Sequence, residues 1–318
     1  MKMRKLGTKG PEISVVGYGA WEIGGDAYGP NPDEKLIFKA IDAALDTGVN
    51  WIDTAEVYGK GNSETLVGKL LKGRRDQVLV ATKVAPGPFG TGFKPEEINK
   101  AVRQSLERLK TDYIDLYQLH WTPDDDEWQV EETWGAMAGL IDEGLVRHIG
   151  VSNFNKETIE RCLAVRHCDS LQPQYSMLHR EGEELHEWCA RKGIGVIVYG
   201  PLAYGLLSGT IDKDTVFDPG DWRSGKWPDQ SYYKELFAPK QLDKHLGTIE
   251  ELKIIAERKG TTMGQLALAW AFGRPGVTAA IAGSRSPEHN RENADAGDVT
   301  LAAYEFEEIE NVLGGSGG

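Results

Sequence analysis

The chain has 318 residues and a formal net charge of -13, from 49 acidic and 36 basic residues. Hydrophobic residues make up 40% of it and charged residues 27%, a balance typical of a globular protein and not of a disordered one. The excess of acid argues against non-specific nucleic-acid binding, which depends on neutralising phosphates. Any anionic ligand therefore needs a local basic pocket.

Composition also bears on the cellular setting. Three cysteines, none in a C-x-x-C pair, favour a reducing compartment, so we expect a cytoplasmic protein. The basic residues at 1–10 precede no apolar run of the kind a signal peptide has. No window approaches the ~18 apolar residues of a membrane span, so we expect no membrane partner. The Gly/Ser-rich end at 314–318 predicts a flexible tail.

The predicted elements alternate between strands and helices along the chain. A turn-rich stretch at 6–11, flanked by apolar residues, predicts an N-terminal hairpin. Short apolar runs then predict strands at 15–19, 50–54, 78–84, 113–120, 146–151, 170–174, 195–199 and 277–282. Apolar residues at helical spacing predict helices at 35–45, 63–71, 95–109, 128–142, 156–165, 183–191, 242–258, 263–272, 287–296 and 301–313.

Eight strand–helix units favour a (β/α)8 TIM barrel with an N-terminal β-hairpin and extra C-terminal helices. An open, doubly wound sheet is the alternative. No break in composition divides the chain, so we predict a single domain over 1–318. The segment 206–241 is rich in Asp, Gly, Pro and aromatic residues and is too long for a plain connector, which predicts a long active-site loop.

Ionisable residues occur where three consecutive predicted strands end. Asp53, Lys83 and His120 occupy these positions, and Tyr58 follows in the loop after the first of them. The carboxyl ends of barrel strands form the active-site face, so we expect these side chains to meet. A buried Lys83 needs a carboxylate partner, and Asp53 is the candidate. We expect the resulting cation to lower the pKa of Tyr58 and make it a proton donor, with His120 orienting a carbonyl oxygen.

Each of these residues, taken singly, is more often a cap or a satisfied structural residue. Their occurrence on adjacent strands favours a shared function. The sequence contains no H-x-H or H-E-x-x-H motif, so we predict no metal site. It also contains no G-x-S-x-G nucleophile elbow of a serine hydrolase and no P-loop. The Gly17-Tyr18-Gly19 run begins like a dinucleotide fingerprint, but Glu22 stands where the third glycine belongs.

Seven motifs resemble those of the aldo-keto reductases, over about residues 3 to 313. They are NWIDTAEVYG (50–59), VATKV (80–84), DLYQLHW (115–121), GVSNF (150–154), LQPQYS (171–176), VYGPLAYGLLSG (198–209) and IAGSRSPEHNREN (281–293). The chain is most similar to bacterial members related to the potassium-channel β subunits. The resemblance implies a barrel that binds NADPH or NADP⁺ without a Rossmann domain.

The resemblance also implies site residues. Tyr58 would be the general acid, tuned by Asp53 and Lys83, and His120 would orient the carbonyl. Ser152, Asn153 and Gln172 would hold the nicotinamide carboxamide, and Tyr199 would stack on the ring. The stretch from Gly200 to Ser208 would wrap the pyrophosphate, Ser284 and Arg285 would meet the 2′-phosphate, and Glu292 and Asn293 the adenine end. The full cofactor set implied is Gly19, Ala20, Trp21, Asp53, Ser152, Asn153, Gln172, Tyr199, Gly200, Pro201, Leu202, Gly205, Leu207, Ser208, Gly283, Ser284, Arg285, His289, Glu292 and Asn293. His289 lies where relatives often carry Gln or Arg, and Ala20 replaces a common Thr.

The substrate pocket is expected to include Trp21, Tyr28, Tyr58, His120 and Trp121. Further rim aromatics, Trp222, Trp227, Tyr232 and Tyr233, favour an apolar or aromatic aldehyde or ketone. The first hypothesis is NADPH-dependent, reversible carbonyl reduction by a monomer or homo-oligomer. The alternatives are a cofactor-sensing regulatory subunit with slow turnover and an unrelated metal-dependent barrel lyase.

Overall fold

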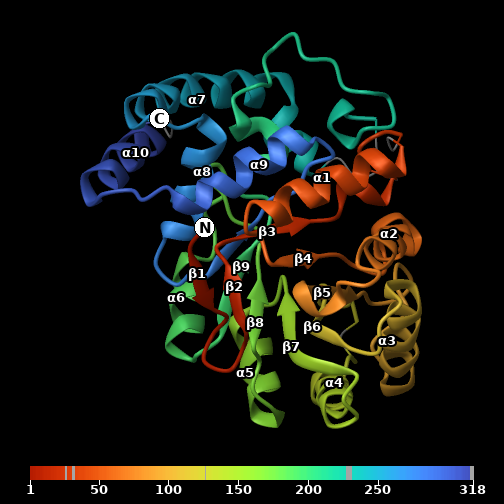
Figure 1. Ribbon diagram of the computed structural model, residues 1–318. Coiled ribbons are helices and arrows are strands. Elements are labelled where there is room, and N and C mark those ends of the chain that lie inside the picture. The colour runs from red at the N-terminus through yellow and green to blue at the C-terminus, as the bar shows by residue number, and fades with distance from the viewer. Residues whose placement is uncertain (26, 31–32, 126, 227–230, 316–318) are drawn as a thin grey trace.

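Eight parallel strands close into a barrel surrounded by helices (Figure 1). A computed structural model describes residues 1–25, 27–30, 33–125, 127–226 and 231–315. The barrel order is β10-β3-β4-β5-β6-β7-β8-β9. Its strands are β3 (Val16–Gly19), β4 (Trp51–Asp53), β5 (Leu79–Val84), β6 (Ile114–Leu119), β7 (Val146–Ser152), β8 (Ser170–Gln172), β9 (Gly195–Val198) and β10 (Ala279–Ile281). The predicted (β/α)8 barrel is thus confirmed, and the open sheet was the wrong alternative.

The helices lie on the outside of the barrel and close to their predicted ranges. They are α1 (Glu34–Asp46), α2 (Asn62–Leu70), α3 (Pro95–Leu109), α4 (Val130–Asp142), α5 (Lys156–Val165), α6 (Glu183–Arg191), α7 (Pro239–Lys259), α8 (Met263–Gly273), α9 (Pro287–Asp295) and α10 (Ala303–Gly315). Side-chain caps begin several of them, as where Asp33 accepts from the backbone N–H of Lys35 and Thr262 from that of Gln265. No helix in the described ranges is long and apolar enough to cross a membrane.

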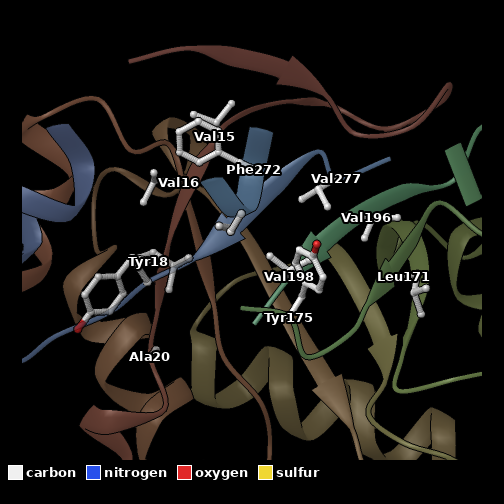
Figure 2. Packing of buried hydrophobic residues seen from close by; sticks show 14 of the residues in the cluster. Val15, Val16, Tyr18, Ala20, Leu171, Tyr175, Val196, Val198, Phe272 and Val277 are labelled. Atoms are coloured by element: carbon white, nitrogen blue, oxygen red, sulfur yellow. The ribbon is translucent and has the colours of Figure 1, made fainter. Parts of the chain in front are cut away.

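Successive apolar residues of several barrel strands belong to two different apolar layers. Ile197 packs in a cluster inside the barrel, whereas its neighbours Val196 and Val198 belong to the larger cluster between strands and helices. Figure 2 shows part of this outer layer, with Tyr18 of β3 and Phe272 of α8 among its members. Because side chains alternate along a strand, every second residue near a strand's carboxyl end points toward the barrel axis.

The N-terminal hairpin is also confirmed. Strands β1 (Met3–Lys5) and β2 (Glu12–Ser14) pair antiparallel, and Leu6 and Ile13 join the inner apolar cluster. A Cβ added to Gly195, at the start of β9, would lie 2.4 Å from a Leu6 side-chain carbon. The hairpin therefore closes the barrel at the amino ends of its strands, which leaves the carboxyl ends open for a site.

Two boundary predictions were wrong. Residues 239–241 of the expected 206–241 loop belong to α7, and Tyr233–Phe237 forms a π-helical turn just before it. The expected flexible tail at 314–318 begins too early, because Gly314 and Gly315 still belong to α10. The remaining tail residues, 316–318, lie outside the described residues, and so does the rim residue Trp227.

Candidate active site

A cleft of about 620 Å³ opens at the carboxyl ends of the barrel strands. Most residues implied by the resemblance line it together: Gly19, Ala20, Trp21, Tyr28, Asp53, Tyr58, His120, Trp121, Ser152, Asn153, Gln172, Tyr199, Gly200, Pro201, Leu202, Gly205, Ser208, Gly283, Ser284, His289, Glu292 and Asn293. Lys83, Leu207 and Arg285 do not line it. Of the other rim aromatics, Tyr232 lines the cleft, whereas Trp222 is buried behind Tyr28 and Tyr204.

Lys83 lies at the centre of the predicted tetrad. It projects inward from β5 and is fully buried, with its Nζ 2.5 Å from Oδ1 of Asp53, which projects from the end of β4. The same ammonium donates to the Thr54 carbonyl at 2.9 Å and to the Tyr58 hydroxyl at 3.3 Å. Burial lowers the pKa of Lys83, and the neighbouring Asp53 carboxylate opposes that shift. The expected Lys–Asp pair beneath the phenol is therefore present.

Tyr58 is positioned by a tight turn after β4. It begins a 3-10 turn (Tyr58–Gly61), in which Gly59 has φ 58°. A Cβ on Gly59 would lie 2.0 Å from the Gly24 carbonyl oxygen, so only glycine allows this turn to approach the one at 22–24. The approach brings the Tyr58 ring within 6.2 Å of the Trp21 ring.

The expected direction of the Tyr58 pKa shift was wrong. Burial, the Asp53 carboxylate and Tyr232 together raise the pKa of Tyr58 well above its usual 10. The charge of Lys83 is matched by Asp53, so it does not overcome the loss of solvent around the phenol. Tyr58 thus keeps its proton at neutral pH and is available as a donor.

His120 follows β6 and faces Tyr58, with ring centroids 5.6 Å apart at 75°. It is 9% exposed, and its Nδ1 has no hydrogen-bond partner. Burial, aided by the Lys83 charge, lowers the pKa of His120 well below 6.5. A neutral imidazole carries one N–H, so His120 can donate one hydrogen bond to a carbonyl oxygen beside the phenol.

Polar side chains from β7 to β9 form the next part of the cleft. The Ser152 hydroxyl donates to the Gln172 carbonyl at 2.8 Å, and the Gln172 amide donates to Oδ2 of Asp53 at 2.8 Å. Asn153 donates to the His120 carbonyl at 3.1 Å and accepts from the Tyr199 hydroxyl at 2.9 Å. These bonds hold the residues implied for the nicotinamide in one network with the tetrad.

The loop after β9 has unusual backbone geometry. Ala203 and Tyr204 have φ of 45° and 56°, in the left-handed region that costs a residue with a side chain about 1–2 kcal/mol. They lie within a kinked 3-10 segment (Ala203–Ser208) that lines the cleft. Such strain persists where the surroundings enforce it and is concentrated at ligand-binding sites. Leu207, implied for the cofactor, is instead fully buried in the outer apolar layer.

The far end of the cleft lies against the start of α9. Ser284 precedes this helix, and its hydroxyl lies 3.5 Å from Nδ1 of His289 in the first turn. The Glu292 carboxylate accepts from the Thr262 hydroxyl at 2.6 Å. Gly283 is required here, because a Cβ would lie 1.8 Å from the Gly19 carbonyl oxygen. A helix N-terminus with a hydroxyl and an imidazole beside it can hold an anionic group.

Arg285 makes contacts that the sequence does not indicate. Its guanidinium donates to the backbone carbonyls of Tyr28 at 2.8 Å and Pro30 at 3.0 Å, and its Nε lies 3.9 Å from the Glu22 carboxylate. Burial raises the pKa of Glu22, while Arg223 and Arg285 oppose the shift. Arg285 therefore ties α9 to the loop between β3 and α1 in this structure.

Sequence reasoning missed several cleft residues, among them Glu22, Arg223 and Gly264. Arg223 binds the Asp221 carboxylate through Nε and one terminal nitrogen, the latter at 2.6 Å, and donates to the Tyr204 carbonyl at 3.1 Å. The backbone N–H of Trp222 donates to the Ala27 carbonyl at 3.0 Å. The described residues of the 209–238 segment and of the β3–α1 loop thus contribute to one wall of the cleft.

The lining fits a nicotinamide dinucleotide. Polar strand ends beside an unpartnered, buried His120 nitrogen lie at one end, and a helix N-terminus lies at the other. A phenol that keeps its proton at the same end makes the cleft suited to adding a proton and a hydride to a carbonyl group. Fold and site together define the class of the protein: an oxidoreductase built on a (β/α)8 barrel.

The chain belongs to the aldo/keto reductase family, whose model matches residues 15–313. It is 36% identical to the aldo-keto reductase YhdN of Bacillus subtilis, over 98% of this chain and 94% of that protein. It is 35% identical to an NADH-specific methylglyoxal reductase of Escherichia coli, over 95% of both chains. A probable voltage-gated potassium channel β subunit of Arabidopsis thaliana is 31% identical, over 98% and 97%.

Solved structures are similar over the same length. A glycerol dehydrogenase of Gluconobacter oxydans, AKR11B4, superposes with a TM-score of 0.85 at 30% identity, covering 99% of this chain and 95% of that one. An aldo/keto reductase of Klebsiella pneumoniae in complex with NADP and acetate gives 0.74 at 30% identity, covering 98% and 96%. These findings confirm the resemblance to the aldo-keto reductases and to channel β subunits.

Proposed function

We propose that this protein reduces aldehydes or ketones to alcohols, reversibly, with NADPH as the hydride source and Tyr58 as the proton donor. The observation that carries the proposal is the contact of the partly buried Tyr58 hydroxyl with the Lys83–Asp53 pair, opposite the His120 ring. Membership of the aldo/keto reductase family supports carbonyl reduction in general. The three buried free thiols support a cytoplasmic location.

Each residue of the tetrad has a separate task. The carbonyl oxygen accepts hydrogen bonds from Tyr58 and His120, which polarises the C=O bond. The bound cofactor supplies the hydride that goes to the carbonyl carbon. Tyr58 gives its proton to the oxygen, and the phenolate left behind is stabilised by the Lys83 ammonium 3.3 Å away. Asp53 keeps that ammonium charged despite its burial.

Oxidation of NADPH by 4-nitrobenzaldehyde tests the proposal. Tyr58→Phe should lower kcat by about 10²- to 10⁴-fold, the usual contribution of a general acid, and leave NADPH binding unchanged in a fluorescence titration. Tyr304→Phe is the matched control, because Tyr304 is 63% exposed on α10. Wild-type turnover in the Tyr58 variant would refute its assigned role.

The preference for NADPH over NADH depends on Ser284 and Arg285. We propose that Arg285 exchanges its carbonyl partners in the β3–α1 loop for the 2′-phosphate, since a charge-assisted bond to phosphate is stronger than one to a neutral carbonyl. Arg285→Ala should raise the KM for NADPH about 10-fold and leave that for NADH nearly unchanged. An equal change for both cofactors would mean that Arg285 only holds the loop.

A further inference from the structure

A second pocket of about 590 Å³ lies beside the catalytic cleft. Four residues line both cavities: Trp121, Asn153, Tyr199 and Tyr232. The rest of the second pocket is lined by the segment after β8, which includes Gln174. None of the residues in this segment that line the pocket is implied for cofactor binding. Since the two cavities share a wall, a molecule larger than a simple aldehyde can occupy both.

The shared wall is a short hydrogen-bonded chain of side chains. The Tyr199 hydroxyl donates to Oδ1 of Asn153 at 2.9 Å and lies 3.4 Å from the Tyr232 hydroxyl. Tyr232 comes from the 209–238 segment, whereas Tyr199 and Asn153 follow barrel strands. A partition made of side chains from a strand end and a long loop can be repacked without disturbing the barrel.

The second pocket begins close to the reacting groups. The Tyr58 ring lies 5.6 Å from that of His120, which lies 4.6 Å from that of Trp121. Trp121 belongs to both cavities. A carbonyl group whose oxygen is bound by Tyr58 and His120 can therefore direct the rest of an extended substrate past Trp121 into this pocket.

The charges around the pocket are negative or already paired. The Glu181 carboxylate is exposed at its edge, and His179 Nδ1 lies 2.9 Å from the Glu235 carboxylate. Within the described ranges, no lysine or arginine lines it. Arg180, between two lining residues, pairs instead with Glu310 at 2.6 Å. An anionic group is disfavoured here by Coulomb repulsion with no compensating cation.

The uncharged part of the lining can bind a polar, neutral group. Three aromatic rings, those of Trp121, Tyr199 and Tyr232, offer flat contact area, and the amide of Gln174 offers both donors and an acceptor. Hydroxyl and amide groups of a ligand can form hydrogen bonds with these side chains, and no charged group has to be removed from water.

We propose that this second pocket is a specificity subsite for the far end of an extended, uncharged substrate that carries hydroxyl or amide groups. The inference rests on the proposed carbonyl reduction and deepens it: the preferred substrates are long, neutral, hydrogen-bonding carbonyl compounds. The subsite consists of Trp121 and Tyr232 as the walls, Gln174 as the polar contact and Glu181 as the charge that rejects anionic ends.

Three aldehydes test the subsite with the intact protein and NADPH. They are 4-nitrobenzaldehyde and two benzaldehydes with a para ethylene-glycol tail of equal length, one ending in a hydroxyl and one in a carboxylate. We expect kcat/KM for the hydroxyl-ended tail to exceed that for the carboxylate-ended tail by about 10-fold at low salt, with a smaller ratio at high salt.

Variants of two residues that line the pocket test whether the difference in kcat/KM arises in the subsite. Gln174→Ala should lower the ratio of kcat/KM for the hydroxyl-ended tail to that for 4-nitrobenzaldehyde by about 3- to 10-fold, the effect of one neutral hydrogen bond. Glu181→Gln should raise kcat/KM for the carboxylate-ended tail relative to that for the hydroxyl-ended tail. Gln77→Ala is the matched control, since Gln77 is exposed at the amino end of β5, on the opposite face of the barrel.

The outcomes separate the two proposals. Failure to reduce any of the three aldehydes would overturn the proposed function. Reduction of 4-nitrobenzaldehyde with equal kcat/KM for both tails, or a Gln174→Ala ratio equal to that of Gln77→Ala, would overturn the subsite alone.

Discussion

The buried Lys83–Asp53 pair allows a quantitative prediction about stability. Lys83→Met keeps the length of the side chain and removes its charge. Asp53, which is 3% exposed, then keeps the amide of Gln172 at 2.8 Å but loses the ammonium at 2.5 Å. The variant therefore leaves a buried carboxylate without a counter-charge.

Breaking a buried ion pair in this way costs about 3–5 kcal/mol. An unfolding entropy of about 2.1 cal/mol/K per residue over the 318 residues converts this into a fall in Tm of about 4–8 °C. Differential scanning calorimetry of the protein without cofactor measures it. Asp53→Asn combined with Lys83→Met should regain most of the loss, because no charge is then buried.

The matched control is Lys69→Met. Lys69 pairs with Glu34 at 2.6 Å, but the two side chains are 41% and 45% exposed. Such surface pairs contribute about 0–1 kcal/mol, so this variant should melt within about 2 °C of the wild type. If Lys83→Met melted no lower than Lys69→Met, or if the double variant were no more stable than Lys83→Met, the reasoning from burial would be refuted.

Two further predictions concern stability. Burial lowers the pKa of His186 to about 4, so its imidazole stays neutral in the folded protein down to that pH. In the unfolded chain the same imidazole takes up a proton below about pH 6.5. The stability present above pH 6.5 should fall by about 3 kcal/mol as the pH drops to 4, and His186→Gln should flatten that dependence in urea titrations; an unchanged pH profile would contradict it. Gly283→Ala should weaken both folding and NADPH binding, since its Cβ would lie 1.8 Å from the Gly19 oxygen. Gly247→Ala, in an exposed and open position of α7, should instead stabilise the protein by about 0.5–1 kcal/mol in the same measurement, and equal effects would refute the steric argument.

The fold was predictable because its signals are local. Each barrel strand is a short apolar run between two segments with helical periodicity. Eight such strand–helix units in one chain favour a closed barrel over other arrangements. The proximity of Asp53 and Lys83 was predictable for the same reason, since both project inward from adjacent strand ends whose register places them together. Tyr58 then follows from the length of the turn after β4.

The features that could not be predicted depend on contacts between loops that are far apart in the sequence. Arg285 binds carbonyls of residues more than 250 positions away, and no periodicity in the chain indicates such a contact. Arg223 and Glu22 both line the cleft, where Trp222 of one loop bonds to Ala27 of the other. The pKa of Tyr58 rises because of burial by several elements at once, whereas the sequence indicated only its charged neighbours.

The two-layer construction of the barrel has a consequence for the supply of protons. Beside the fully buried Lys83 lie the buried side chains of Gln118 and Ser170, 3.2 Å apart, and the inner apolar cluster includes Leu116 and Leu6 of the N-terminal hairpin. The amino end of the barrel is thus closed by side chains of the strands and of the hairpin. In the proposed reaction, the proton that Tyr58 gives to one substrate molecule would therefore be restored through the mouth of the cleft, once the alcohol has left and solvent reaches the phenol.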